Sequence, residues 1–145
     1  LWQGRAPERL ITVDNRAAFV TLAPDVNELI LLAPGVHTQL AELFISRLTP
    51  GFVWGHLCDW HPKALTQALR LAERLKRPLR LPIPRQVGEL VACYGRPLAA
   101  DASWATLNLP SSLQNLLEPL ISQNKWLEQE SLALFSTHQL SGGEV

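Results

Sequence analysis

The 145-residue chain contains no methionine and only two cysteines, and its thirteen basic side chains balance thirteen acidic ones. The even charge argues against strong autonomous binding to nucleic acid, because neutralising phosphates supplies much of that affinity and favours a basic excess. No apolar run approaches the ~20 residues that span a bilayer, so we expect no membrane partner.

The two cysteines, Cys58 and Cys93, match no metal-binding or redox spacing. Both have apolar neighbours in the sequence, and we expect them to be buried free thiols. Free thiols persist in a reducing compartment, so we expect the protein in the cytoplasm.

Several catalytic motifs are also absent from the sequence. It has no glycine-rich phosphate loop, no G-x-S-x-G elbow and no Cys/His pair at a recognised catalytic spacing. Nothing therefore supports a nucleotide-hydrolysing or acyl-transfer enzyme. The chain starts at Leu1 without an initiator methionine, and we expect it to be part of a longer protein.

Residues 1–85 alternate short apolar runs with helical repeats. We predict strands at Arg9–Val13, Glu28–Leu32 and Phe52–Leu57, with a short edge strand at Leu79–Leu81. The predicted helices follow residue 15, residue 38 and residue 61; the second has its apolar face at residues 40, 43, 44 and 48. This alternation favours an α/β fold with a mostly parallel sheet covered by helices.

Residues 86–145 have a different pattern, which predicts a small helical extension packed on the core formed by residues 1–85. Helices are predicted at residues 86–94, 111–123 and 126–135. Pro119 should bend or end the second of them. Residues 97–110 are predicted to be irregular, and Ser141–Gly143 to form a loose tail.

Acidic side chains follow two of the predicted strands: Asp14 ends the first, and Asp59 follows the third, with His61 two residues later. In an open α/β sheet, neighbouring strand ends form the crevice where ligands bind. Carboxylates there could share a divalent cation, and the imidazole would suit Mn²⁺ or Zn²⁺ better than Mg²⁺. The structural alternatives are helix caps, Asp14 or Asn15 for one helix and Asp59 for the other.

Two further groups have both a functional and a structural interpretation. His56 could join His37 and His61 in a zinc site, or it could be a satisfied, partly buried histidine. The basic residues concentrated between positions 63 and 80 could meet a phosphate backbone or form a solvated helix face. They are Lys63, Arg70, Arg74, Lys76, Arg77 and Arg80.

The two acidic segments resemble the motifs of the Toprim family, the metal-binding α/β module of topoisomerases, primases and certain nucleases. That family has a strand ending in Glu, often Glu-Asn, and a later strand ending in Asp-x-Asp. Val13–Phe19 resembles the first motif and Leu57–Leu65 the second. The most similar subgroup is the C-terminal domain of JetD, the Wadjet/MksG nuclease subunit; the Toprim domain of the topoisomerase VI A subunit is more distant. Trp126–Glu130 also resembles the Leu-Glu-Gln-Glu stretch near the end of JetD-type chains.

This resemblance implies a Toprim-like sheet, DNA as a partner, condensin-like SMC subunits as further partners, and Mg²⁺ or Mn²⁺ as cofactor. It implies catalytic roles for Asp14 and Asp59, and metal binding by Asp14, Asp59 and His61. Contacts with DNA would come from the basic residues, which we expect to be Lys63, Arg70, Arg74 and Arg77.

The sequence departs from the family at three positions: Asp14 replaces Glu, His61 replaces the second Asp, and Ala64 replaces the usual Gly. Mg²⁺ depends on a few well-placed charged oxygens, so two functions remain open. One is metal-dependent DNA cleavage in plasmid or phage defence, with Asp59 as metal anchor and Asp14 as general base or acid. The other is a catalytically degenerate module that binds DNA or a protein partner. A plain α/β domain of unrelated function is a third alternative.

Overall fold

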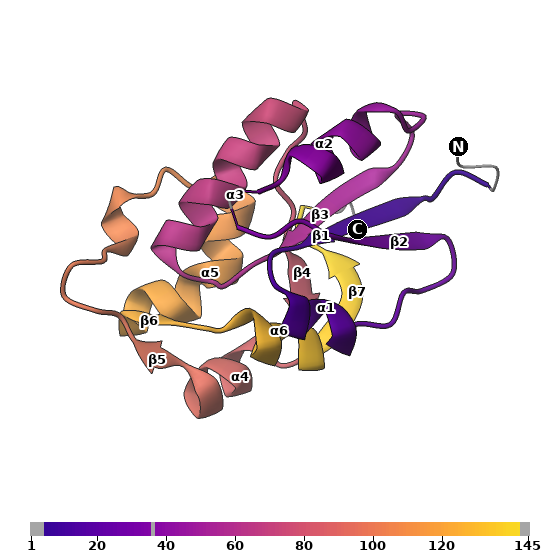
Figure 1. Ribbon diagram of the computed structural model, residues 1–145. Helices are drawn as coiled ribbons and strands as arrows, with labels where there is room; N and C mark the ends of the chain where they lie inside the picture. The colour runs from indigo at the N-terminus through magenta and orange to yellow at the C-terminus, as the bar shows by residue number, and fades with distance from the viewer. Residues whose placement is uncertain (1–4, 36, 143–145) are drawn as a thin grey trace.

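The computed structural model describes residues 5–35 and 37–142. Its centre is a parallel sheet of three strands in the order β2-β1-β3 (Figure 1). These strands are β1 (Arg9–Val13), β2 (Glu28–Leu32) and β3 (Val53–Leu57). The register aligns Val13 with both Leu32 and Leu57, so the three carboxyl ends lie level at one edge. The predicted parallel sheet is confirmed.

Three helices follow these strands: α1 (Arg16–Thr21), α2 (Gln39–Ser46) and α3 (Pro62–Leu75). The chain steps from β1 to β2 in one direction and from β2 past β1 to β3 in the other. Because parallel crossovers are right-handed, α1 and α2 lie on opposite faces. Figure 1 shows α3 on the same face as α2. Asn15 caps α1 by accepting a hydrogen bond from the N–H of Ala18 at 2.8 Å.

The later part of the chain contains strands as well as the predicted helices. Its elements are β4 (Pro82–Pro84), α4 (Val87–Tyr94), β5 (Arg96–Pro97), the short 3₁₀ helix η1 (Trp104–Thr106), α5 (Ser111–Gln123), β6 (Lys125–Trp126), α6 (Gln129–Leu134) and β7 (Ser136–Leu140). β4 pairs with β7 and β5 with β6, both antiparallel. Pro119 lies inside α5 without ending it.

Two sequence predictions, one about the end of the first part and one about the tail, are corrected. The predicted edge strand at Leu79–Leu81 is not a strand, although the carbonyl of Arg80 accepts the N–H of His56 at 2.9 Å beside β3. Ser141 is buried rather than loose, because its hydroxyl accepts the N–H of Leu81 at 2.8 Å. Gly143 lies outside the described residues.

Two predictions about buried side chains are also wrong. Cys58 is buried as expected, but Cys93 is exposed. Leu40 and Leu43 were expected to face the core, yet they are 83% and 50% exposed, and α2 buries residues 41 and 45 instead. The helical period was recognised, but the face that α2 buries is set by its packing on the sheet.

One apolar core joins both parts of the chain. Leu10, Leu57 and Leu65 from the first part and Leu113 and Leu127 from the second are almost fully buried in the same cluster. The later segments are therefore part of the same packing unit as the sheet. In the described ranges, no helix combines the length and apolar character needed to cross a membrane.

The turn after α4 provides a stability test. A Cβ added at Gly95 would overlap the carbonyl oxygen of Val91, a backbone atom that cannot rotate away. We expect Gly95→Ala to lower the free energy of unfolding by about 1–3 kcal/mol in urea denaturation. Gly88→Ala is the matched control, because nothing lies within 4 Å of that Cβ and alanine favours helix by up to about 1 kcal/mol. Equal effects of the two changes would contradict the assigned backbone at Gly95.

Candidate functional site

The candidate site lies where β1 and β3 end side by side. The N–H of Asp14 donates to the carbonyl of Leu57 at 2.9 Å, which ties the two strand ends together. From here the chain leaves toward α1 on one face and toward α3 on the other (Figure 1). Such a topological switch point opens a crevice at the carboxyl edge of a sheet. Asp14 and Asp59 follow these two strand ends, so the structure brings both residues to this edge.

Gln129, at the start of α6, connects the loops after the two strands. Its backbone N–H donates to Oδ1 of Asp59 at 2.9 Å and its side-chain amide donates to the same oxygen at 3.4 Å. Its amide oxygen accepts the N–H of Asn15 at 3.1 Å. The side chain of Asn15 in turn donates to Oε1 of Glu130 at 2.7 Å. One turn of α6 therefore fixes both loops.

The carboxylates at this edge influence one another electrostatically. Burial raises the pKa of Asp59; the hydrogen bonds from Gln129 oppose this shift, and the negative charges of Glu130 and Asp14 add to it. We call Asp14, Asp59 and Glu130 the acidic edge. Sequence reasoning assigned no role to Glu130 or Gln129, although the similarity of Trp126–Glu130 to a family motif was the available signal.

His61 has a structural task in this structure. Its Nδ1 accepts the N–H of Lys63 at 3.1 Å, so it is His61, rather than Asp59, that caps α3. Its ring packs edge-on against Trp126 with 5.3 Å between centroids. Within residues 5–35 and 37–142, no three His, Cys, Asp or Glu side chains form a group that could hold a metal. Asp14, Asp59 and His61 do not converge as a three-ligand site, and neither do the three histidines considered above.

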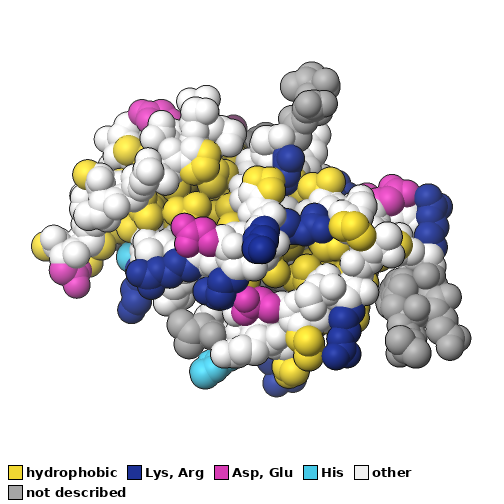
Figure 2. All heavy atoms as spheres, turned by 90° about the horizontal axis from the view of Figure 1, so that it is seen from above, with side chains coloured by type: hydrophobic (Ala, Val, Ile, Leu, Met, Phe, Trp, Pro, Cys, Tyr) yellow, Lys and Arg dark blue, Asp and Glu magenta, His cyan; other side chains and the backbone are white. Residues whose placement is uncertain are grey.

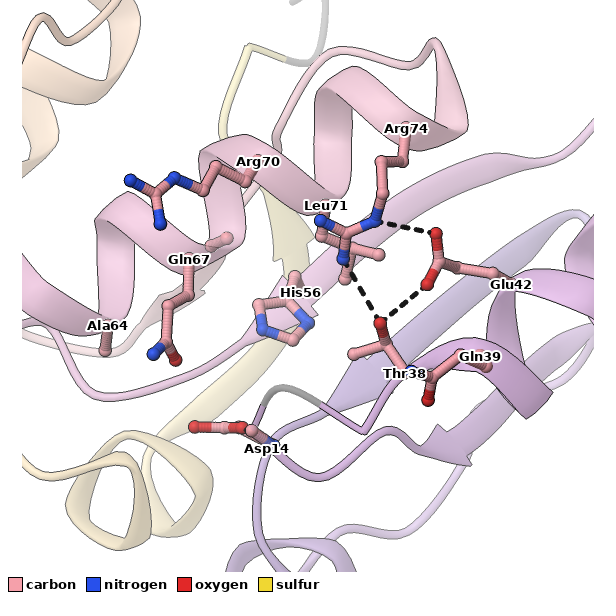
Figure 3. Close-up of a pocket in the computed structure, with 12 residues that line it drawn as sticks. Asp14, Thr38, Gln39, Glu42, His56, Ala64, Gln67, Arg70, Leu71 and Arg74 are labelled. Atoms are coloured by element: carbon pink, nitrogen blue, oxygen red, sulfur yellow. Dashed lines mark hydrogen bonds and ion pairs between the residues drawn. The ribbon is translucent and has the colours of Figure 1, made fainter.

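A cavity of about 480 Å³ opens beside the acidic edge, between α2, α3 and the sheet (Figure 3). We call it the α2–α3 cavity. Asp14 and His56 line it from the sheet, and Gln67, Arg70 and Leu71 line it from α3.

The α2 side of this cavity is held by a polar network (Figure 3). Arg74 donates to Glu42 at 2.9 Å and to the hydroxyl of Thr38 at 3.2 Å, and that hydroxyl donates to Glu42 at 2.7 Å. Burial acts to raise the pKa of Glu42, but the bonds from Thr38 and Arg74 and the arginine charge leave it below its ordinary value. The charge of Arg74 is thus balanced within the wall.

His56 forms the floor of the cavity and is only 4% exposed. Its Nδ1 lies 2.8 Å from the hydroxyl of Thr12, which accepts the indole N–H of Trp54 at 3.0 Å. Burial lowers the pKa of His56 to about 4, so the ring is neutral near pH 7. The Thr12 hydroxyl has one proton, and Nδ1 is a much nearer acceptor than the carbonyl of Gly55 at 3.4 Å. We therefore assign Nδ1 as acceptor and the ring proton to Nε2.

The basic side chains expected to meet DNA divide into two sets. Lys63, Arg70 and Arg74 recur at helical spacing along one side of α3. Arg77 follows the helix instead, where it donates to the carbonyls of Phe52 and Pro50 at 2.9 and 3.1 Å and lies 3.9 Å from the Phe52 ring. Figure 2 looks onto the face that α2 and α3 cover and shows Lys and Arg interspersed with Asp and Glu.

The lowered pKa of buried His56 leads us to expect a loss of stability in acid. The pKa of His56 is about 4 when folded, against ~6.5 when unfolded, so the unfolded chain binds the proton first as the pH falls. The contribution of neutral His56 is complete above pH ~6.5 and is lost between ~6.5 and ~4, by about 3 kcal/mol. Urea denaturation across this range should show a steeper pH dependence for the wild type than for His56→Gln. Identical pH profiles would contradict the assignment.

Comparison of the chain with protein-family models, curated proteins and solved structures found no match. Any functional assignment therefore rests on the chain's own residues, that is, on their motifs, geometry and chemistry.

Proposed function

We propose that the chain is a Toprim-like module of the JetD kind, associated with condensin-like SMC complexes, that binds DNA without cleaving it. The observation that carries this proposal is the arrangement of Asp14 and Asp59 around the switch point between β1 and β3, with a basic stripe on the adjacent α3. We call Lys63, Arg70 and Arg74 the α3 stripe.

The α3 stripe has dimensions that suit a nucleic-acid backbone. Its ends are eleven residues apart on one helix, which corresponds to about 16 Å along the axis. One DNA strand places about five phosphates over that length. Arg70 is exposed, and no other group in the described part of the chain pairs with its guanidinium. Arg74 is partly neutralised by Glu42, so binding should be of modest affinity and sensitive to salt.

The geometry favours binding over cleavage because the acidic positions are engaged in structural contacts. Oδ1 of Asp59 accepts two hydrogen bonds from Gln129, and His61 caps α3. The family's second Asp is missing, and Mg²⁺ depends on a few charged oxygens at near-ideal geometry. As they stand, these residues do not fit a catalytic Mg²⁺ site, so we assign no chemical step to a metal.

Charge removal on the α3 stripe tests the DNA-binding proposal. The double variant Lys63→Gln/Arg70→Gln should weaken binding to a fluorescent DNA duplex in anisotropy titrations. It should also reduce the slope of log K against log salt by roughly one per lost phosphate contact. Arg85→Gln is the control, because Arg85 is exposed between β4 and α4, away from the α3 stripe. A wild-type chain that does not bind DNA, or equal losses in both variants, would refute the proposal.

The acidic edge favours metal-dependent DNA cleavage as a second candidate. Burial raises the pKa of Asp59, the charges of Glu130 and Asp14 add to this, and a divalent cation would relieve the repulsion between these carboxylates. Under our proposal, plasmid DNA incubated with the chain and Mn²⁺ or Mg²⁺ should stay supercoiled on agarose gels. If the wild type nicks the plasmid, Asp59→Asn abolishes the nicking and the control Glu89→Gln, which changes an exposed acid, preserves it, this second candidate would replace our proposal.

A further inference from the structure

The α2–α3 cavity contains a donor that none of the described residues uses. Nδ1 of His56 is engaged by Thr12, but Nε2 has no hydrogen-bond partner among the residues that the structure describes. In the same residues, the only fully enclosed side-chain nitrogen or oxygen without a partner is the indole nitrogen of Trp60, so Nε2 of His56 is open to the cavity. A side chain that is only 4% exposed thus presents one N–H to a ligand.

The groups around this donor indicate which kind of ligand would fit the cavity. Figure 3 shows the His56 ring in the cavity, with Gln67 and Arg70 projecting from α3 on one side and Asp14 below. Gln67 and Arg70 can donate to an anion, and the exposed guanidinium of Arg70 lies where a phosphate could reach it from solvent.

Asp14 supplies a hydrogen-bond acceptor instead of a donor. Its Oδ1 accepts the N–H of Gly35, which has a positive φ of 50°. The other oxygen of Asp14 has no partner in residues 5–35 and 37–142 and can accept from a hydroxyl. The cavity therefore combines an anion-binding side with an acceptor for hydroxyl groups.

We propose that the α2–α3 cavity binds a nucleoside monophosphate, with the phosphate on Arg70, a hydroxyl on Asp14 and an acceptor atom on Nε2–H of His56. The volume of about 480 Å³ lies in the range usual for small-molecule sites. The nucleotide is either free or the phosphorylated terminus of a DNA strand; the second source rests on the proposed function. Because the ring of His56 is neutral near pH 7, it donates a hydrogen bond without adding charge.

Calorimetry and NMR on the full chain test the site with defined probes. AMP should bind saturably, shift the ring Nε2 resonance of His56 in a ¹⁵N–¹H spectrum, and bind more tightly than inorganic phosphate. Gln67→Ala should weaken AMP binding by up to roughly tenfold, as expected for one hydrogen bond. Glu73→Ala is the matched control, because Glu73 is exposed on the same helix and does not line the cavity. Gln67 is partly exposed and its replacement keeps a good helix former, so folding is not at risk.

Oligonucleotides with and without a 5′-phosphate distinguish the two sources. Preferential binding of the phosphorylated end, in competition with AMP, supports the strand terminus; binding of AMP alone supports the free nucleotide. If neither probe moves the His56 resonance, or if inorganic phosphate binds as tightly as AMP, the cavity proposal is refuted. If Gln67→Ala leaves duplex binding through Lys63 and Arg70 unchanged, the proposed function would stand even where the cavity proposal is refuted.

Discussion

The parallel pairing of β1 with β3 is the constraint on which the rest of this structure depends. It aligns Val13 with Leu57 and continues one residue further through the bond from the N–H of Asp14 to the carbonyl of Leu57. Since β2 occupies the other side of β1, the helices must divide between two faces, and the crevice opens where they part. Both the acidic edge and the α2–α3 cavity lie at this point because the strand order creates it.

The sequence predicted the central strands well because each is a short apolar run between turn residues. The predicted bounds of β1 and β2 agree with the structure, and β3 starts one residue later. Elements defined by partners distant in the chain were missed. Trp126 was predicted to start a helix, but it belongs to the strand Lys125–Trp126, which pairs with β5, and Ser136–Leu140 became a strand by pairing with β4. Local periodicity contains no information about such partners.

The same reason explains which parts of the site were foreseen. Asp14 and Asp59 could be placed at one edge because strand ends can be recognised locally. The contacts that decide their chemistry join residues far apart in sequence: Gln129 to Asp59, and Thr12 to His56. His61 was expected as a metal ligand, with Asp59 as the alternative cap, but His61 itself caps α3, a role that depends on the orientation of its ring. The nearly complete burial of His56, and hence its low pKa, follows from packing that no short segment encodes.

At this edge, the two hydrogen bonds from Gln129 to Asp59 perform part of the structural role that a bound cation would have. Gln129 saturates Oδ1 of Asp59 and at the same time holds the loop after β1 through Asn15. A metal in a carboxylate crevice similarly joins strand-end loops that would otherwise repel each other. Neutral amides provide that linkage without requiring a second aspartate at position 61, which leaves His61 free to cap α3. No charge is neutralised in this way, so burial, together with the remaining repulsion from Glu130 and Asp14, keeps the pKa of Asp59 raised. A module built in this way can keep its crevice and its α3 stripe in place with no ion bound, which is the physical basis of our proposal that DNA binding is separate from cleavage.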